Sequence, residues 1–214
     1  LWSTVRPYLV QDSPPRATGH TAWRALVEQS ALPAALRSTQ VTVWLGPRLH
    51  AVAYPVRRGD ALNVVVLAES APAGDARDWD QSSSLPALQA ATGRTSGALQ
   101  ALLEAVPDWR AWTLNDRPPL ASPSQMAGER IALVGDAAHP MLPYLAQGAG
   151  MAIEDAVALA EALDCGDAAA VAAALMRFAE TRWQRNALVQ ARARRNGGIF
   201  HATGLVRFGR DAAL

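Results

Sequence analysis

Hydrophobic and polar residues alternate between residues 17 and 68, in short runs separated by turn-forming residues. A two-residue period places successive side chains on opposite faces of a strand. Because the connecting turns are short, the strands are expected to pair as an antiparallel sheet. The pattern predicts strands over residues 18–26, 41–45, 49–56 and 60–67, with turns at 46–48 and 58–59.

Beyond residue 84 the apolar residues recur every three or four positions, which is typical of helices. Gly197-Gly198 is expected to break the last long helical segment, because glycine is a poor helix former. The pattern predicts helices over residues 85–91, 96–106, 151–163, 167–195 and 199–208, and a strand over 109–114.

A third pattern lies between an apolar run at 131–134 and the helix that follows Gly148. The run predicts a strand buried on both faces, and Pro140 and Pro143 make the segment after it irregular. A strand, a loop and a helix start in this order present free backbone N–H groups and the positive end of the helix dipole to a bound group. Asp136 directly follows the apolar run, so its carboxylate is expected to have a polar partner.

The residues of this loop resemble a known motif. The segment Gly135-Asp136-Ala137-Ala138-His139-Pro140, followed by Pro143 and by Gln147-Gly148-Ala149-Gly150 with Glu154-Asp155-Ala156, is similar to the second flavin-contacting motif of the single-component FAD-dependent aromatic hydroxylases. This is the fold group of p-hydroxybenzoate hydroxylase, and the resemblance is strongest to its salicylate and 3-hydroxybenzoate hydroxylase-like branch. From the residues alone, an ordinary strand–loop–helix unit with a capping aspartate is the alternative.

The resemblance implies a role for each residue of the loop. Asp136 would bind the ribityl hydroxyls of FAD, and Pro143 would lie beside the isoalloxazine ring. The backbone at the start of the helix would hydrogen-bond the pyrimidine edge of the ring. The residues of the loop and helix start that the resemblance assigns to FAD are Gly135, Asp136, Pro143, Gly148, Ala149 and Gly150.

The first six residues, Leu1-Trp2-Ser3-Thr4-Val5-Arg6, resemble the tail of the family's D-G-x-x-S-x-V-R motif, which implies that Arg6 also contacts FAD. The family begins with a G-x-G-x-x-G turn for the FAD pyrophosphate, and the sequence contains no complete turn of this kind. We therefore expect the C-terminal part of a longer enzyme.

The expected fold class is α/β, and α+β within this chain. An antiparallel substrate-binding sheet with flanking helices would be joined to part of a Rossmann-like FAD-binding domain and to a C-terminal helical region. The expected segments are a remnant of the FAD-binding domain at 1–16, the sheet domain at 17–114, the FAD-binding loop and helix at 115–165, and the helical region at 166–214.

His50 and Tyr54 are four residues apart, so they face the same side of the predicted strand over 49–56. The family's sheet roofs its substrate pocket, and the resemblance implies that His50 is the base or phenol-orienting group. Tyr54 would be a pocket hydrogen-bonding residue, and Gln147 a polar contact near the substrate. From pattern alone, a half-buried His and Tyr bonded to the backbone is the simpler interpretation.

The remaining histidines, His20 and His201 among them, are interpreted as structural. No metal site is predicted, because the four histidines are scattered along the sequence and Cys165 is the single cysteine. That one cysteine excludes an internal disulfide and suits a reducing cytoplasm.

The composition is that of a globular protein, with 50% hydrophobic and 18% charged residues. A formal net charge of +1 gives no field that would attract nucleic acid. The basic residues at 182–195 are interpreted as the solvated face of a helix. No apolar run is long enough to span a membrane, so neither a membrane nor nucleic acid is expected as a partner. A homodimer is compatible with this interpretation.

The function that the resemblance implies is hydroxylation of a phenolic aromatic acid, such as salicylate or a hydroxybenzoate. NAD(P)H would reduce FAD, O2 would add at the flavin C4a position, and the hydroperoxyflavin would pass one oxygen to the ring. Two alternatives stay open: a noncatalytic fragment or module that folds without flavin, and the same fold acting as an epoxidase or oxidase on a non-aromatic substrate. The chain alone is expected to retain FAD weakly and to be inactive.

Overall fold

The computed structural model describes residues 1–11, 13–72, 74–95, 97–164 and 167–213. Cys165, the single cysteine of the sequence, lies outside these residues. The chain divides into two compact units, which are described separately. The sheet unit comprises Ala17–Leu114 and Gly198–Leu214, and the loop–helix unit comprises Leu1–Arg16 and Asn115–Gly197.

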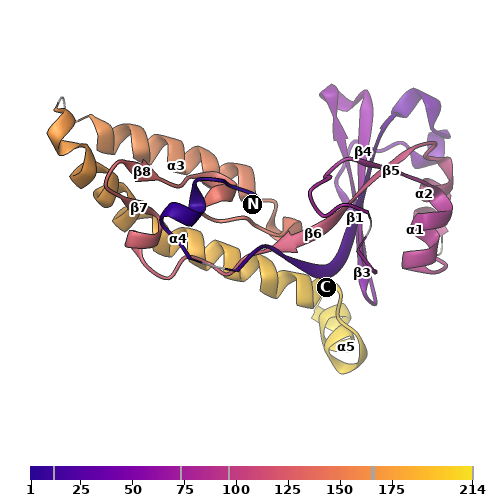
Figure 1. The fold of residues 1–214 in the computed structure, drawn as a ribbon. Coiled ribbons are helices and arrows are strands. Elements are labelled where there is room, and N and C mark those ends of the chain that lie inside the picture. The colour runs from indigo at the N-terminus through magenta and orange to yellow at the C-terminus, as the bar shows by residue number, and fades with distance from the viewer. Residues whose placement is uncertain (12, 73, 96, 165–166, 214) are drawn as a thin grey trace. The chain divides into compact units, whose positions relative to one another are not determined.

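The sheet unit contains a six-stranded sheet with the strand order β2-β3-β4-β1-β6-β5 (Figure 1). The four strands predicted from alternation are present, and β1 pairs with β4, β2 with β3 and β3 with β4, each antiparallel. The prediction of an antiparallel sheet with flanking helices is therefore confirmed. The strands are β1 (Arg16–Glu28), β2 (Thr42–Gly46), β3 (Leu49–Val56), β4 (Ala61–Glu69), β5 (Gln81–Ser83) and β6 (Trp109–Asp116).

Two short helices, α1 (Leu85–Thr92) and α2 (Gly97–Ala105), cover one face of this sheet (Figure 1). Alternate residues of the strands, such as Ala51, Ala53 and Val64, pack with residues of these helices in one hydrophobic cluster. Ser84 caps α1, because its hydroxyl accepts a hydrogen bond from the amide of Ala87. The opposite side chains of β3, including His50, therefore belong to the other face of the sheet.

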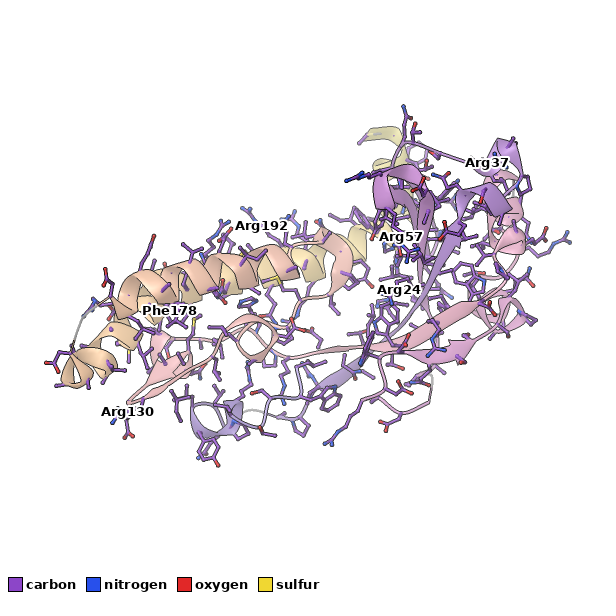
Figure 2. The ribbon with its side chains drawn as sticks, turned by 90° about the horizontal axis from the view of Figure 1, so that it is seen from above. Arg24, Arg37, Arg57, Arg130, Phe178 and Arg192 are labelled. Carbon is purple, nitrogen blue, oxygen red and sulfur yellow. The ribbon has the colours of Figure 1, made fainter. Side chains whose placement is uncertain are left out.

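The loop–helix unit contains α3 (Gly148–Leu163) and most of α4 (Val171–Phe200). A second hydrophobic cluster lies in this unit and includes Leu133, Met126 and Phe178. Phe178, in the N-terminal half of α4, is buried in this cluster, whereas Arg192, in its C-terminal half, is exposed (Figure 2).

The prediction of a strand buried on both faces at 131–134 is wrong. Only Ile131–Ala132 forms a strand, β8, which pairs antiparallel with β7 (Ala127–Gly128). Both residues of β8 are half-buried, and Val134 is exposed. Leu133 is buried, and its amide donates to the carbonyl of Met126. The apolar run therefore packs against the hydrophobic core on one face only.

The predicted helix break at Gly197-Gly198 is also wrong, because α4 continues through both glycines to Phe200. A Cβ atom at Gly197 would lie 2.7 Å from Cε2 of Tyr144, whereas a Cβ at Gly198 would meet nothing within 4 Å. Gly197 is therefore required by a close side-chain approach and not by a turn. The last helix, α5 (Gly204–Ala213), begins five residues later than predicted, at Gly204, whose φ is +57°.

Short 3-10 turns complete the secondary structure: η1 (Arg6–Tyr8), η2 (Gln29–Ala31), η3 (Ala34–Leu36), η4 (Arg57–Gly59), η5 (Pro123–Gln125), η6 (Gly135–Ala137), η7 (Pro143–Leu145) and η8 (Ala168–Ala170). Within the described ranges, none of the helices combines the length and the apolar character that crossing a bilayer requires.

Candidate functional site

The Gly135-Asp136 turn is held against the side of α3. Gly135 has a φ of +54°, which favours glycine, and a Cβ atom there would lie 3.4 Å from the Cβ of Ala152. Its amide donates a 3.1 Å hydrogen bond to Oδ2 of Asp155, one turn beyond Met151 in α3. The contacts with Ala152 and Asp155 of α3 therefore fix both the backbone conformation and the position of the turn.

Asp155 is the centre of a buried polar network. Nε2 of His139 donates to Oδ2 of Asp155 at 2.6 Å, and Nε of Arg182 donates to Oδ1 at 2.9 Å. Nδ2 of Asn186 adds a 3.1 Å bond to Oδ1. The carboxylate is completely buried, so its charge is compensated by these donors instead of water. Four residues of the loop, α3 and α4 are tied together in this way.

The pKa of Asp155 reflects this competition. Burial is the largest effect and acts to raise it, but the hydrogen bonds from His139, Asn186 and Arg182 together lower it to about 2. Asp155 is therefore ionised at neutral pH, and as an ionised carboxylate it accepts hydrogen bonds only, so Nε2 of His139 carries the proton.

Asp155 is absent from the residues that the sequence predicts for the site, although it belongs to the Glu154-Asp155-Ala156 segment after the loop. The signal is its spacing, because Asp155 lies one helical turn after Met151 and both are buried. An acidic residue on the buried side of a helix requires partners. The solvated-face interpretation of the basic residues at 182–195 is wrong for Arg182, which is buried and bonded to Asp155.

Asp136 itself is exposed, so its carboxylate is hydrated and does not need the internal polar partner expected above. Its backbone carbonyl accepts a 2.8 Å hydrogen bond from the N-terminal amine of Leu1. An exposed carboxylate on a turn with a defined backbone conformation can accept hydrogen bonds from the hydroxyls of a ligand.

Arg6 supports the same turn. Its side chain is almost completely buried, and Nη1 donates to the carbonyls of Ala137 at 2.7 Å and Ala138 at 3.0 Å. These bonds hold the backbone immediately after Asp136. The structure therefore assigns Arg6 a supporting contact, and its direct contact with FAD stays a prediction.

The loop then enters α3 with an open helix terminus. Pro143 begins the turn η7, and Ala146 adopts a left-handed conformation with a φ of +52°. Gln147 precedes the helix, and its side chain makes no capping hydrogen bond. The amides of Gly148, Ala149 and Gly150 are in the first helical turn, where no intrahelical carbonyl is available to them. Pro143, Gln147, Ala149 and Gly150 are exposed, and Gly148 is half-buried.

In the sheet unit, His50 is buried on β3. Its Nδ1 lies 2.8 Å from Nε2 of His201, and its ring is in edge contact with Phe200 at a centroid distance of 5.2 Å. Burial, together with the nearby His20, lowers the pKa of His50 to about 4, so the imidazole is neutral at pH 7. Tyr54 lies on the same side of β3 and is 36% exposed.

Three of the four histidines, although scattered along the sequence, lie close together in the structure. They are His20, His50 and His201, and the rings of His20 and His201 are 4.9 Å apart in an edge-to-face arrangement. Burial is the largest cause that lowers the pKa of His201 to about 3, and His50, His20 and Arg210 act in the same direction. His201 is therefore part of the surroundings of His50.

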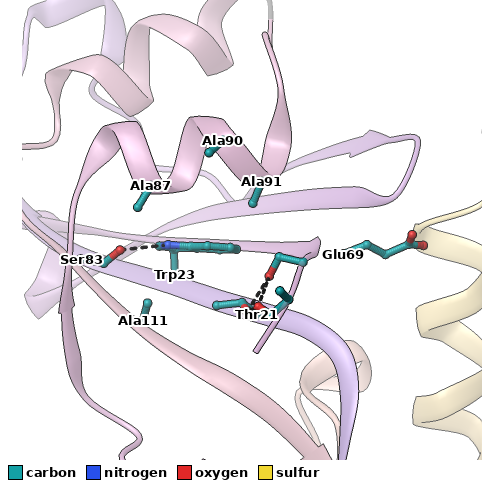
Figure 3. Close-up of a pocket in the computed structure, with 10 residues that line it drawn as sticks. Thr21, Trp23, Glu69, Ser83, Ala87, Ala90, Ala91 and Ala111 are labelled. Carbon is teal, nitrogen blue, oxygen red and sulfur yellow. Dashed lines mark hydrogen bonds between the residues drawn. The ribbon is translucent and has the colours of Figure 1, made fainter. Parts of the chain in front are cut away.

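The sheet unit also has a pocket of ≈ 400 Å³ on the side covered by α1. Figure 3 shows the Trp23 indole beneath Ala87, Ala90 and Ala91 of that helix. Nε1 of Trp23 donates to the hydroxyl of Ser83 at 3.2 Å. Trp23 belongs to the helix-covered core cluster, whereas His50 is on the other side of the sheet. None of the residues predicted for the site lines this pocket.

Comparison with known proteins identifies relatives for nearly the whole chain. The sequence model of a family described as "FAD binding domain" matches residues 2–193. A 3-hydroxybenzoate 6-hydroxylase of Klebsiella oxytoca is 38% identical over 208 residues, which are 96% of this chain and 50% of the relative. A 3-amino-4-hydroxybenzoate 2-monooxygenase of Streptomyces platensis is 37% identical over 201 residues, 94% of this chain and 49% of the relative.

Solved structures give the same picture. A salicylate hydroxylase substrate complex matches with a TM-score of 0.82 and 26% identity, covering 97% of this chain and 55% of that chain. HpxO of Klebsiella pneumoniae, complexed with FAD and uric acid, matches with a TM-score of 0.79 and 26% identity, covering 98% of this chain and 53% of that chain. The chain spans about half the length of the relatives it matches.

Proposed function

Because this chain belongs to the family of FAD binding domains, we propose that it supplies the flavin-ring and substrate side of an FAD-dependent monooxygenase that hydroxylates a phenolic acid. The observation that carries the proposal is the Gly135–Gly150 segment, in which an exposed carboxylate and an uncapped helix start lie on one supported loop. The named activities of the two sequence relatives, which act on a hydroxybenzoate and an aminohydroxybenzoate, support the substrate class.

The residues of this segment fit FAD. The Asp136 carboxylate would accept hydrogen bonds from the ribityl hydroxyls, and the amides of Gly148 to Gly150 would donate to the electronegative edge of the ring. Pro143 would contact the ring itself, and Arg6 would hold the loop backbone in place. Bound FAD would supply electron transfer from NAD(P)H and activation of O2, which protein side chains cannot provide.

His50 would orient the phenol. In a neutral imidazole whose Nδ1–H donates to Nε2 of His201, the lone pair is on Nε2, and this nitrogen would accept a hydrogen bond from the phenol. The pKa of about 4 favours this accepting role over full protonation of the ring. His201 would thereby hold His50 in the required tautomer.

Tyr54 and Gln147 complete the proposed substrate contacts. The Tyr54 hydroxyl would bind a polar group of the acid from the same side of β3 as His50, and Gln147 would contribute an amide near the ring. The small aromatic substrate, O2, the co-substrate NAD(P)H, a cytoplasmic location and a homodimer belong to the same proposal.

Kinetics of the full coding sequence that contains this chain test the proposal. The expected result is oxidation of NAD(P)H that is stimulated by a phenolic acid and yields a hydroxylated product. The His50→Gln variant should lose about 10- to 10²-fold in kcat/KM, and Asp136→Ala should release FAD more readily. Val43→Thr, at an exposed position of β2, is the control and should change neither quantity. Turnover of non-aromatic substrates only, or stable folding without any flavin binding, would contradict the proposal.

A further inference from the structure

The histidine cluster of the sheet unit includes a carboxylate. His20, Glu69 and His201 each place one ligand atom within 4.8 Å of the others. The proposed function uses none of these three as a contact with flavin or substrate. We propose that His20, Glu69 and His201 form a binding site for a divalent transition-metal ion of the zinc type.

The backbone brings the three residues together from distant parts of the sequence. His20 in β1 and Glu69 in β4 are direct partners in the antiparallel register. The carbonyl of His201 accepts a 3.1 Å hydrogen bond from the amide of Arg48, whose own carbonyl accepts a bond from the amide of Glu69. Main-chain hydrogen bonds therefore join the sheet to the segment after α4 at the cluster. The positions of the three ligand residues are set by the backbone as well as by their side-chain conformations.

The ligand types select the metal. Two imidazole nitrogens and one carboxylate oxygen are a common set for Zn²⁺ and related ions, whereas Ca²⁺ and Mg²⁺ prefer oxygen ligands. Around one tetrahedral Zn²⁺ the ligand atoms are roughly 3.3 Å apart, so the group must contract slightly. The Glu69 side chain is 45% exposed and can move, and its exposure also leaves solvent to occupy the fourth position.

The guanidinium of Arg48 competes with the metal for the carboxylate of Glu69. Nε of Arg48 lies 3.6 Å from Oε2 of Glu69, and both side chains are largely exposed. An exposed ion pair of this kind contributes little, because water screens it. Removal of the Arg48 charge should therefore strengthen metal binding modestly, and this outcome separates a site at Glu69 from nonspecific binding to histidines.

Metal binding has a consequence for His50, and this consequence alone depends on the proposed function. Because Nε2 of His201 is engaged with Nδ1 of His50, Nδ1 is the His201 nitrogen that can bind a metal without breaking that bond. A neutral His201 that binds metal through Nδ1 carries its proton on Nε2 and donates it to His50. His50 then has its own proton on Nε2 and cannot accept a phenol hydrogen bond there. Occupied metal sites should therefore inhibit phenol hydroxylation.

Titration of the 214-residue chain with Zn²⁺ tests the site. Calorimetry and competition with a chromophoric chelator measure the stoichiometry and the affinity. One equivalent of Zn²⁺ should bind. His20→Ala and Glu69→Gln should each weaken binding by roughly tenfold or more, and Arg48→Gln should strengthen it by roughly twofold to fivefold. Glu28→Gln is the matched control, because Glu28 lies in the same strand as His20 and forms an exposed ion pair with Arg57.

Circular dichroism of each variant establishes that it folds. The d–d absorption of bound Co²⁺, lost in Glu69→Gln and kept in Glu28→Gln, gives a second readout that is independent of enzymatic activity. Absence of stoichiometric binding by the folded chain, or equal affinity in the parent chain, His20→Ala and Glu69→Gln, would overturn the proposal. Inhibition of hydroxylation does not enter this test, so failure of the proposed function would leave its result unchanged.

Discussion

Nε2 of His139 lies 2.6 Å from Oδ2 of Asp155, and both side chains are almost completely buried. The histidine belongs to the loop that follows Asp136, and the aspartate belongs to α3. A charge-assisted hydrogen bond of this kind is among the stronger polar contacts in proteins. It joins the two halves of the proposed flavin-ring site, the exposed carboxylate and the open helix terminus, through a contact that flavin itself need not touch.

Asp155→Asn should destabilise the chain by about 3 kcal/mol. The substitution leaves the buried guanidinium of Arg182 without its compensating charge, and the new amide group meets donors where the carboxylate accepted hydrogen bonds. Urea denaturation followed by circular dichroism measures the change. Glu161→Gln, at an exposed position of the same helix, is the control. Equal midpoints for the two variants would show that the network contributes little.

The same network predicts a dependence on acid. Because the pKa of Asp155 is about 2 in the folded chain and 3.8 is its ordinary value, the ionised form is favoured by folding. Its contribution of about 2 kcal/mol is present above pH 4 and is lost as the pH falls from about 4 towards 2. The free energy of unfolding, measured between pH 5 and 2, should fall less steeply in Asp155→Asn than in the parent chain. Parallel curves would contradict the assignment.

The buried histidine pair predicts a loss of stability at a higher pH. The pKa values of His50 and His201 are lowered to about 4 and about 3, from an ordinary value of 6.5. Their stabilising contribution is therefore present above pH 6.5 and is lost as the pH falls from there towards 4 and 3. Each histidine adds a slope of about 1.4 kcal/mol per pH unit, because the unfolded chain binds a proton that the folded chain does not.

Denaturation of the chain at several pH values between 7 and 4.5 measures this slope, in a range above the titration of Asp155. His50→Gln removes one of the protons that the unfolded chain takes up and keeps a polar partner for His201. Because His20 also contributes to the slope, the slope should fall by about one third to one half. The half-buried His20, whose pKa is also lowered by burial, remains in both proteins. An unchanged slope would show that His50 titrates alike in the folded and unfolded states.

The sheet could be predicted from sequence because its signal is local. Alternation within a strand such as Leu49–Val56 shows directly which residues share a face, and the structure has the predicted strand ends for that segment. The Gly135–Gly150 loop could be found for a related reason, since its glycines and prolines act through the backbone of neighbouring residues.

Contacts between distant residues could not be predicted in this way. His20, His50 and His201 are far apart in the sequence, and only the register of the sheet and the end of α4 bring them together. The partners of Asp155 could not be predicted either, because Arg182 and Asn186 are 27 and 31 residues away in the sequence. Gly197 was predicted to break the helix because it is a glycine. Its role depends instead on the ring of Tyr144, which is 53 residues away in the sequence.

That close approach predicts opposite effects for two neighbouring glycines. Gly197→Ala places a methyl group 2.7 Å from the buried ring of Tyr144, and the strain should destabilise the chain by about 1–3 kcal/mol. Gly198→Ala meets nothing within 4 Å and should be neutral or stabilising by up to about 1 kcal/mol, because alanine is the better helix former. Thermal unfolding of both variants measures the difference. Similar losses in the two would contradict the role assigned to Gly197.

Flavin binding by the chain itself provides the most direct test of the proposed loop. The residues assigned to the cofactor, Asp136, Pro143 and the amides of Gly148 to Gly150, would contact its ring and ribityl chain, which riboflavin and FAD share. We therefore expect the chain to bind both flavins weakly and with nearly equal affinity. Quenching of flavin fluorescence measures this binding. Asp136→Ala should weaken both by about tenfold, and Asp164→Ala, an exposed control at the end of α3, should weaken neither. A strong preference for FAD would show instead that residues of this chain bind its phosphates or its adenosine.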